Sequence, residues 1–210
     1  MDQLSQSKAK TRDRLLEAAI AAFSTEGIVG ATTREIARGA GVNEVTLFRH
    51  FQSKEQLLAA VAEHITALKA EALIHTDEWS QDLQSNLLVY AHLHDNMLEE
   101  YEALIRMFIG EAKRHPHESL QVLQEYFLPL RNHLIAYLRT CVERGTVHAE
   151  VDLPLAVDQF TGMLLAGMLR RHVVPVERGY SRDRYVEACV DLFVRGISPS
   201  AALTSSTSPA

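Results

Sequence analysis

Apolar residues recur every three or four positions along most of the chain, and no stretch shows the sustained alternation of apolar and polar residues that is typical of strands. This spacing predicts an all-α fold of about nine helices. We expect the helices at residues 11–25, 33–39, 44–50, 53–74, 80–98, 101–114, 119–144, 154–172 and 181–196. Glycine and proline residues separate the helices of the second half.

The two ends of the chain lack this periodicity. The stretch 198–210, SPSAALTSSTSPA, is rich in serine, threonine and proline and has no apolar face to bury, so we expect a disordered tail there. We expect residues 1–9 to form a disordered N-terminal arm. Between the two, residues 10–56 are predicted to form a small three-helix domain and residues 57–197 a larger helical domain.

Short-range signals define the first helices. The first predicted helix has one apolar stripe, made of Leu15, Leu16, Ala19, Ile20 and Phe23. Gly27 is suited to end this helix in the left-handed conformation. Thr32 followed by Glu35 predicts a capping box, in which the hydroxyl accepts from a backbone amide and the carboxylate reaches back. Ile36 and Ala37 then fall on the inner side of the second helix.

A tight turn joins the second predicted helix to the third. Gly41 is suited to a left-handed turn, and Val42 is placed to pack beneath it. Asn43 is a strong N-cap for the third helix, which buries Leu47 and Phe51 four residues apart on one face. This order of helix, turn and helix predicts a helix-turn-helix.

A helix-turn-helix presents its second helix end-on, so that side chains can reach base edges in the major groove of DNA. Backbone amides at helix N-termini and basic side chains hold the flanking phosphates. Thr33 starts the second helix, and Lys54 follows Ser53, which with Gln56 predicts a capping box at the start of the fourth. The alternative is a helical corner that packs and binds nothing.

The segments ATTREIA (31–37), GV (41–42), LFRHF (47–51) and SKEQL (53–57) make this part of the chain resemble the DNA-binding domain of the TetR/AcrR family of bacterial transcriptional regulators. The resemblance implies an N-terminal three-helix helix-turn-helix domain and a C-terminal helical ligand-binding and dimerisation domain. It also implies a repressor that binds a palindromic double-stranded DNA operator as a homodimer and is released by a small-molecule effector, with no cofactor.

Ten residues are the candidates for DNA contact. They lie at the start of the second and fourth helices and along the third: Thr33, Arg34, Asn43, Glu44, Val45, Thr46, Phe48, Arg49, His50 and Lys54. Phe48 stands where the family usually has a tyrosine whose hydroxyl meets a phosphate, and phenylalanine cannot form that bond. Glu44 either accepts from a cytosine amino group or repels the DNA. Thr46 and Arg49 are therefore the preferred contacts.

The larger domain places polar residues among apolar ones, which is the usual lining of a small-molecule site. By resemblance, its helices surround an effector cavity, for which the candidates are His64, Leu68, Tyr90, His94, Ile105, Phe108, Phe127 and Arg131. The alternative is that the polar members are satisfied core residues or lie on solvated faces. His92 and His94 point different ways and cannot share a metal ion. His115 and His117 flank Pro116 and could share one, but no carboxylate or thiol pattern lies nearby, so we expect no metal site.

The last two predicted helices carry more apolar surface than one small body can cover. By resemblance they form a four-helix interface with a second copy, for which the candidates are Phe160, Met163, Leu164, Gly167, Met168, Tyr185, Ala188 and Leu192. The alternative is an ordinary core. A two-fold dimer would place its two recognition helices about 34–36 Å apart, one turn of DNA.

Charge is divided unevenly along the chain. The net charge is −6, but residues 1–56 carry net +1 and the remainder net −7, so the head alone can meet DNA. No apolar run approaches the roughly 20 residues of a membrane span, and the polar N-terminus has no secretory signal. We therefore expect a cytoplasmic, nucleoid-associated protein without membrane contact.

Other function classes find little support in the motifs. The chain has no GxSxG, GxGxxG, GxxxxGK or HExxH motif, so we expect no enzyme. Cys141 and Cys189 are expected to be packed, reduced thiols. A second alternative is a helical ligand-binding or scaffold protein whose head has lost its affinity for DNA.

Overall fold

The computed structural model describes residues 3–74, 82–113, 116, 120, 124, 127–173 and 179–199. Nine helices and no strand occupy these residues, which confirms the all-α prediction. The helices are α1 (Gln3–Gly30), α2 (Thr33–Gly39), α3 (Glu44–Phe51), α4 (Lys54–Ile74), α5 (Leu83–Glu100), α6 (Glu102–Ala112), α8 (Leu128–Glu143), α9 (Leu153–Val173) and α10 (Arg182–Ile197).

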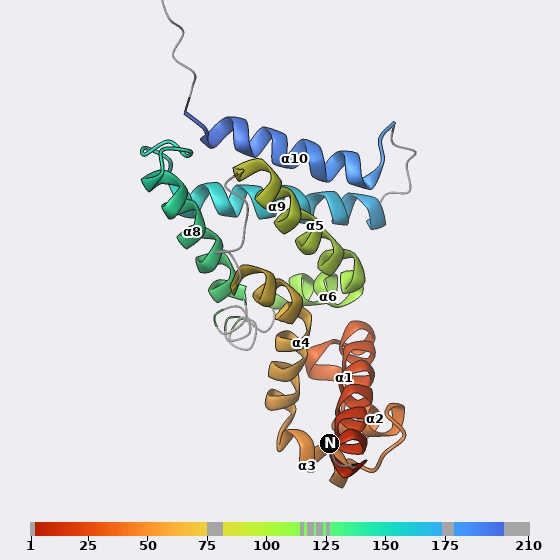
Figure 1. Ribbon diagram of the computed structural model, residues 1–210. Helices are drawn as coiled ribbons and strands as arrows, with labels where there is room; N and C mark the ends of the chain where they lie inside the picture. Colours follow the sequence, from red (N-terminus) through yellow and green to blue (C-terminus); the bar gives the residue numbers. More distant parts are fainter. Residues whose placement is uncertain are drawn as a thin grey trace, which may run out of the picture.

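The helices form a small head and a larger body. Figure 1 shows α1, α2 and α3 at the lower end of the molecule and α9 and α10 crossing its upper end, with α4 running from one part to the other. Three packed helix pairs join the parts, because α1 lies against α6 and α4 lies against both α5 and α8. The head is therefore joined to the body through α1, its first helix, and through α4, the helix that follows it.

The head is built around a fully buried apolar cluster. Leu15, Leu16 and Phe23 of α1 pack with Ile36 of α2 and Leu47 of α3, all at most 1% exposed. Leu16 and Phe23 lie seven positions apart, which puts them on the same inner side of α1. The predicted core of the head is thus confirmed.

The start of α1 differs from the expectation of a disordered arm. The helix begins at Gln3, and the Thr11 hydroxyl donates to the Ser7 carbonyl at 2.9 Å within its second turn. Residues 3–10 contain glutamine, lysine and alanine, which favour helix, and no glycine or proline. Gly27 has the expected positive φ, 78°, but marks a kink from which the chain continues helically to Gly30.

The local signals of the helix-turn-helix are confirmed. Thr32 and Glu35 form both bonds of a capping box, and the Asn43 side chain accepts from the Thr46 amide at 2.8 Å. Gly41 has φ 66°, in the left-handed region that a residue with a Cβ avoids. The turn between α2 and α3 is therefore specified within a dozen residues of sequence.

The body is held together by aromatic stacking across three helices. The ring of Phe160 on α9 stacks on Phe193 of α10, with centroids 4.4 Å apart, and on Tyr90 of α5, with centroids 6.2 Å apart. Beside this layer the buried Asp95 carboxylate accepts from Arg171 at 2.7 Å and Arg182 at 2.5 Å. The same three helices are thus joined by both apolar packing and ion pairs.

Candidate nucleic-acid interface and effector cavity

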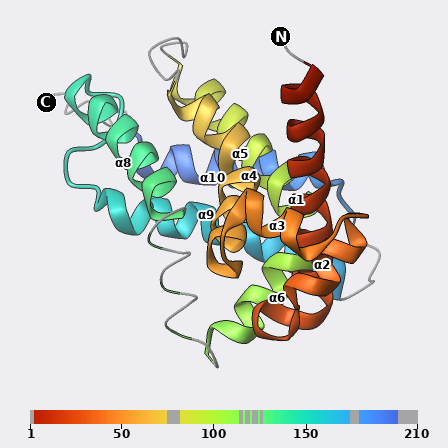
Figure 2. The same ribbon diagram turned by 90° about the horizontal axis from the view of Figure 1, so that it is seen from below.

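Helix α3 turns one face to the core of the head and the other to solvent. Leu47 and Phe51 are buried, whereas Val45 is 60% and Phe48 41% exposed. Figure 2 looks onto this end of the molecule and shows α2 and α3 on the near side. Large apolar side chains on a free helix face indicate a surface that is covered by a partner.

The ten candidate residues all reach the surface of the head. Arg34, Asn43, Val45, Phe48 and Arg49 are exposed, and the half-buried members are Thr33, Glu44, Thr46, His50 and Lys54. The structure therefore brings the set together on one end of the molecule, as a helix-turn-helix that reads DNA requires. Contact with DNA itself stays a prediction.

Glu44 has a role that the sequence did not suggest. Its carboxylate accepts a hydrogen bond from the Thr33 hydroxyl at 2.6 Å, which ties the start of α3 to the start of α2. Two of the candidate contacts are thus bonded to each other. The acidic group is oriented by this bond and helps to set the angle between the two helices of the motif.

Thr46 is positioned as a hydrogen-bond acceptor. Its hydroxyl donates to the Asn43 side chain at 2.8 Å, which uses its one hydrogen and leaves the oxygen able only to accept. In the major groove the complementary donors are the amino groups of adenine and cytosine. Thr46 is therefore suited to sense those bases.

Lys54 is tied to the end of α1. Its ammonium group donates to the Val29 carbonyl at 3.1 Å, where the helix leaves its last backbone acceptors without intrahelical partners. Ser53, just before it, caps α4 by accepting from the Gln56 amide at 3.2 Å. The candidate phosphate contact thus also fixes the start of α4 against the head.

The early turns of α1 add two basic residues, Lys8 and Arg12, that are not in the candidate set. The Arg12 guanidinium lies 5.6 Å from the centre of the Phe51 ring, at the end of α3. Burial lowers the pKa of His50, and the nearby charges of Lys8 and Arg12 lower it further. The net positive charge of residues 1–56 was the only sequence signal for Lys8 and Arg12. Their position beside α3 could be seen only once α1 was found to begin at Gln3.

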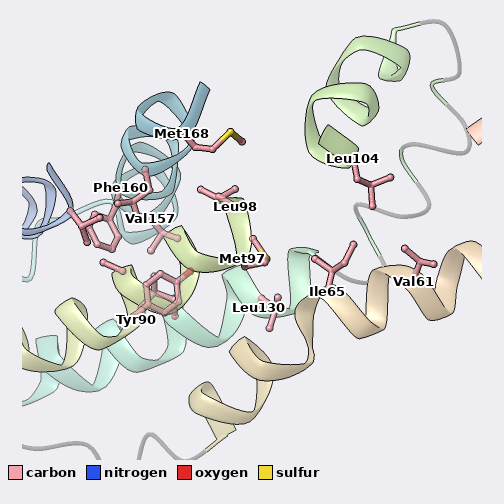
Figure 3. Close-up of a cluster of buried hydrophobic side chains, with 14 of the residues drawn as sticks. Val61, Ile65, Tyr90, Met97, Leu98, Leu104, Leu130, Val157, Phe160 and Met168 are labelled. Carbon is pink, nitrogen blue, oxygen red and sulfur yellow. The ribbon is translucent and has the colours of Figure 1, made fainter. Parts of the chain in front are cut away.

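A cavity of about 400 Å³ lies where the head meets the body. In Figure 3, Val61 and Ile65 of α4, Leu104 of α6, and Met97 and Leu98 of α5 lie around it. The other described lining residues are Ile28, Leu58, Ala62, His94, Ile105, Met107, Phe108, Ile109, Phe127, Asp158, Thr161, Gly162 and Leu165. The wall therefore includes residues from the head, from α4 and from the body.

Four of the eight candidate effector residues line this cavity, namely His94, Ile105, Phe108 and Phe127. Tyr90 is buried behind the wall, with its ring stacked on His94 at 5.9 Å. His64 is exposed and absent from the lining, because α4 turns Val61, Ala62 and Ile65 inward. The side chain of Leu68 lies outside the described residues.

Arg131 reaches the cavity only through a partner. Its guanidinium donates two hydrogen bonds to Asp158, at 2.5 and 2.7 Å, and a third to the Pro154 carbonyl at 3.2 Å. The bond from Arg131 lowers the pKa of Asp158, which is itself a lining residue. Arg131 itself is not among the described lining residues of the cavity.

Four of the eight candidate dimer residues belong to the core of one protomer. Phe160, Leu164 and Met168 are fully buried, because they form the inner stripe of α9. Gly167 is covered by the Tyr185 ring, into which a Cβ at that position would project. The prediction that these residues meet a second copy was wrong, since they have no surface left to offer.

An apolar groove remains open on the outer side of α9 and α10. Leu192 is 65% exposed, Leu155 is also exposed, and Met163 and Ala188 are half-buried. The groove encloses about 700 Å³ between Leu155, Met163, Leu192 and their neighbours. Of the candidate interface residues, Met163 and Leu192 line this groove, whereas Tyr185 and Ala188 are half-buried and are not among its described lining residues.

The described parts of the chain contain neither a metal site nor a membrane span. No group of histidine, cysteine, aspartate and glutamate side chains in them could hold a metal ion. None of the helices in these parts is long and apolar enough to cross a bilayer.

Comparison with protein families gives two adjoining matches. Residues 15–61 match the model of bacterial regulatory proteins of the tetR family, and residues 75–189 match that of the tetracyclin repressor-like C-terminal domain. The first match contains the helix-turn-helix, and the second contains most of the body. Together they cover both parts of the molecule.

Similar proteins are regulators of transcription. The HTH-type transcriptional regulator YvkB of Bacillus subtilis is 28% identical and aligns over 90% of this chain and 97% of its own. The HTH-type transcriptional repressor NicS of Pseudomonas putida is 39% identical over 65% of this chain and 63% of its own. The probable acrEF/envCD operon repressor of Escherichia coli is 25% identical over 93% of this chain and 90% of its own.

Solved structures share the fold. The TetR family transcriptional regulator PfmR from Thermus thermophilus has a TM-score of 0.60 and 25% identity, covering 89% of this chain and 100% of its own. The fatty acid degradation regulator FadR from Bacillus halodurans has a TM-score of 0.69 at 21% identity, covering 87% and 94%. The second likeness shows the fold alone.

Proposed function

The chain belongs to the TetR family of bacterial regulatory proteins, which are DNA-binding transcriptional regulators, and we propose that it is a ligand-responsive repressor that binds a palindromic operator as a homodimer. The observation that carries this proposal is the exposed face of α3, with Val45 and Phe48 uncovered on a helix whose other face is fixed in the core. Residues 10–56 then form the DNA-binding domain and residues 57–197 the effector-binding and dimerisation domain.

The DNA contacts divide into two kinds. Val45, Thr46 and Arg49 on the outer face of α3 are proposed to meet base edges, as a recognition helix does. Arg34 and Lys54, with Lys8 and Arg12 of α1, are proposed to hold phosphates on either side. Phe48 contributes apolar contact, such as to a thymine methyl group, in place of a tyrosine hydroxyl.

The second copy is proposed to cover the groove on α9 and α10. A stable interface needs about 800 Å² from each partner, and Leu155, Met163 and Leu192 supply a continuous apolar strip for it. Leu192→Arg should therefore shift the protein to a monomer in sedimentation velocity. Val89→Arg, at a comparably exposed position on α5, is the matched control and should leave the dimer intact. Equal behaviour of the two variants would contradict this interface.

Coupling between the cavity and the DNA surface is proposed to run through the ends of α1 and α4. Ile28 and Leu58 both line the cavity, and Val29, next to Ile28, accepts the hydrogen bond of Lys54. A ligand that favours another spacing of these helices would weaken operator binding by its differential affinity for the two states.

Binding to DNA fragments from the region upstream of the gene tests the proposal. Affinity should fall steeply with salt, because phosphate contacts release counterions. Lys54→Ala should weaken binding to all sequences alike, whereas Thr46→Val should change the preference among them. A helical scaffold with an inactive head is the alternative function, and it would bind none of the fragments at low ionic strength.

A further inference from the structure

The wall of the cavity is almost entirely apolar. Of the eighteen described residues that line it, three are polar or charged, namely His94, Asp158 and Thr161. The Thr161 hydroxyl already donates to the Val157 carbonyl at 2.9 Å, and the His94 ring lies flat against Tyr90. A guest therefore meets mainly aliphatic and aromatic carbon.

Asp158 is the one charged residue among these eighteen, and its charge is neutralised by Arg131, which is not a lining residue. Asp158 accepts two hydrogen bonds from Arg131, at 2.5 and 2.7 Å, and the pair carries no net charge toward the cavity. The bond from Asp158 also raises the pKa of Arg131, so the pair is stable in its ionised form. No described lysine or arginine lines the cavity.

We propose that this cavity takes an uncharged, largely apolar molecule, and that it discriminates against carboxylates and ammonium ions of the same size. The inference rests on the proposed function, since it names the class of the effector. Among the described lining residues a carboxylate would lose its hydration without meeting a lysine or arginine, and an ammonium ion would meet an aspartate whose charge Arg131 has cancelled. Burial of an unpaired charge costs several kcal/mol, whereas apolar area removed from water is favourable.

The size of the cavity limits the guest further. Ligand pockets in proteins usually enclose about 300–1,000 Å³, and about 400 Å³ lies near the lower limit. A bicyclic aromatic body fits this space. Guests with one ring system and at most one or two polar groups are expected.

Three probes that share a naphthalene ring and differ in charge separate the effect of charge on binding from the effect of shape. We would measure the binding of 1-naphthalenemethanol, 1-naphthoate and 1-naphthylmethylammonium to the full-length protein by equilibrium dialysis at pH 7. The alcohol should bind at least about tenfold more tightly than either ion, because the penalty for an unpaired charge exceeds the roughly 1.4 kcal/mol of one factor of ten. Binding of either ion as tight as that of the alcohol would overturn the proposal.

A matched pair of variants locates the binding. Ala62 is buried on the cavity wall, so Ala62→Phe places a ring inside the cavity and should weaken binding of the alcohol at least about tenfold. Ala136 is exposed on α8 and is not a lining residue, so Ala136→Phe should bind like the wild type. Equal binding by both variants would contradict the assignment to this cavity, as would the failure of all three probes to bind the wild type.

DNA binding, measured on the same samples, distinguishes a failure of the proposed effector class from a failure of the proposed repressor function. If the upstream DNA is bound and an ion is the preferred guest, the repressor function stands and the effector class is wrong. If the alcohol binds in the cavity but no DNA fragment is bound at low salt, the effector class stands and the repressor function is wrong.

Discussion

Replacement of Asp95 by alanine tests what holds α5, α9 and α10 together. The carboxylate is 0% exposed and accepts hydrogen bonds from Arg171 and Arg182. Removal of one member of a buried ion pair costs about 3–5 kcal/mol, because the charges left behind have no partner. Here Arg171 keeps Glu99 at 2.5 Å and Arg182 keeps Asn96 at 2.6 Å.

These second partners place the expected cost of Asp95→Ala at the low end of that range, about 3 kcal/mol. Asp158→Ala is the matched control, because this carboxylate also accepts two short hydrogen bonds from one arginine but is 55% exposed. An exposed pair contributes about 0–1 kcal/mol, since water solvates the arginine that remains. Burial, and not bond length, should therefore decide the difference between the two variants.

Urea unfolding followed by circular dichroism measures both changes. With slopes of about 1–3 kcal/mol per molar urea, a loss of 3 kcal/mol lowers the midpoint by about 1 M or more. All samples need the same protein concentration, because the stability of a dimer depends on it. A cost for Asp158→Ala equal to that for Asp95→Ala would refute the reasoning, as would a cost below about 1 kcal/mol for Asp95→Ala.

Three further changes have defined outcomes. Gly41→Ala should lower the free energy of unfolding by about 1–2 kcal/mol, because φ is 66° there, and Gly41→Asn should cost less. Gly167→Ala should be destabilising in thermal unfolding, since its methyl group would overlap the Tyr185 ring, whereas Gly162→Ala has open space and should stabilise α9 by about 0.5–1 kcal/mol. Burial alone would raise the pKa of Glu99, but hydrogen bonds from a histidine and an arginine of α9 outweigh it and lower the pKa. A group with a lowered folded-state pKa stabilises the protein above its ordinary value of 4.5 and loses this effect as the pH falls through the folded-state pKa. The stability difference between wild type and Glu99→Gln in urea should therefore shrink below pH 4.5, and a constant difference would contradict this origin.

The head could be predicted from the sequence because its signals are short-range. The Thr32 and Glu35 capping box, the Asn43 cap and the Gly41 turn each depend on residues within four positions. Such interactions can be predicted from neighbouring residues without knowing the fold. The bond from Thr33 to Glu44 joins residues eleven positions apart and became visible only with the helices in place.

The body was harder to predict because several helix faces are apolar at once. Phe160, Leu164 and Met168 share one stripe of α9, and Leu155 and Met163 share another. Helical spacing identifies both stripes but not which of them faces the core of the same protomer. His64 was also misplaced, since adjacent residues of α4 point in different directions around the helix axis, and Ile65 is buried whereas His64 is exposed.

The central claim, that two heads read DNA together, is tested most directly by a footprint on an operator selected from random DNA by the full-length protein. Two-fold symmetric protection is expected in two half-sites whose centres lie about 34–36 Å apart, one turn of the duplex. Each complex should contain two protomers, counted by sedimentation, and Arg49→Ala should abolish the pattern. A single asymmetric protected patch bound by one protomer, or no enrichment of any sequence, would show that the two heads do not read DNA together.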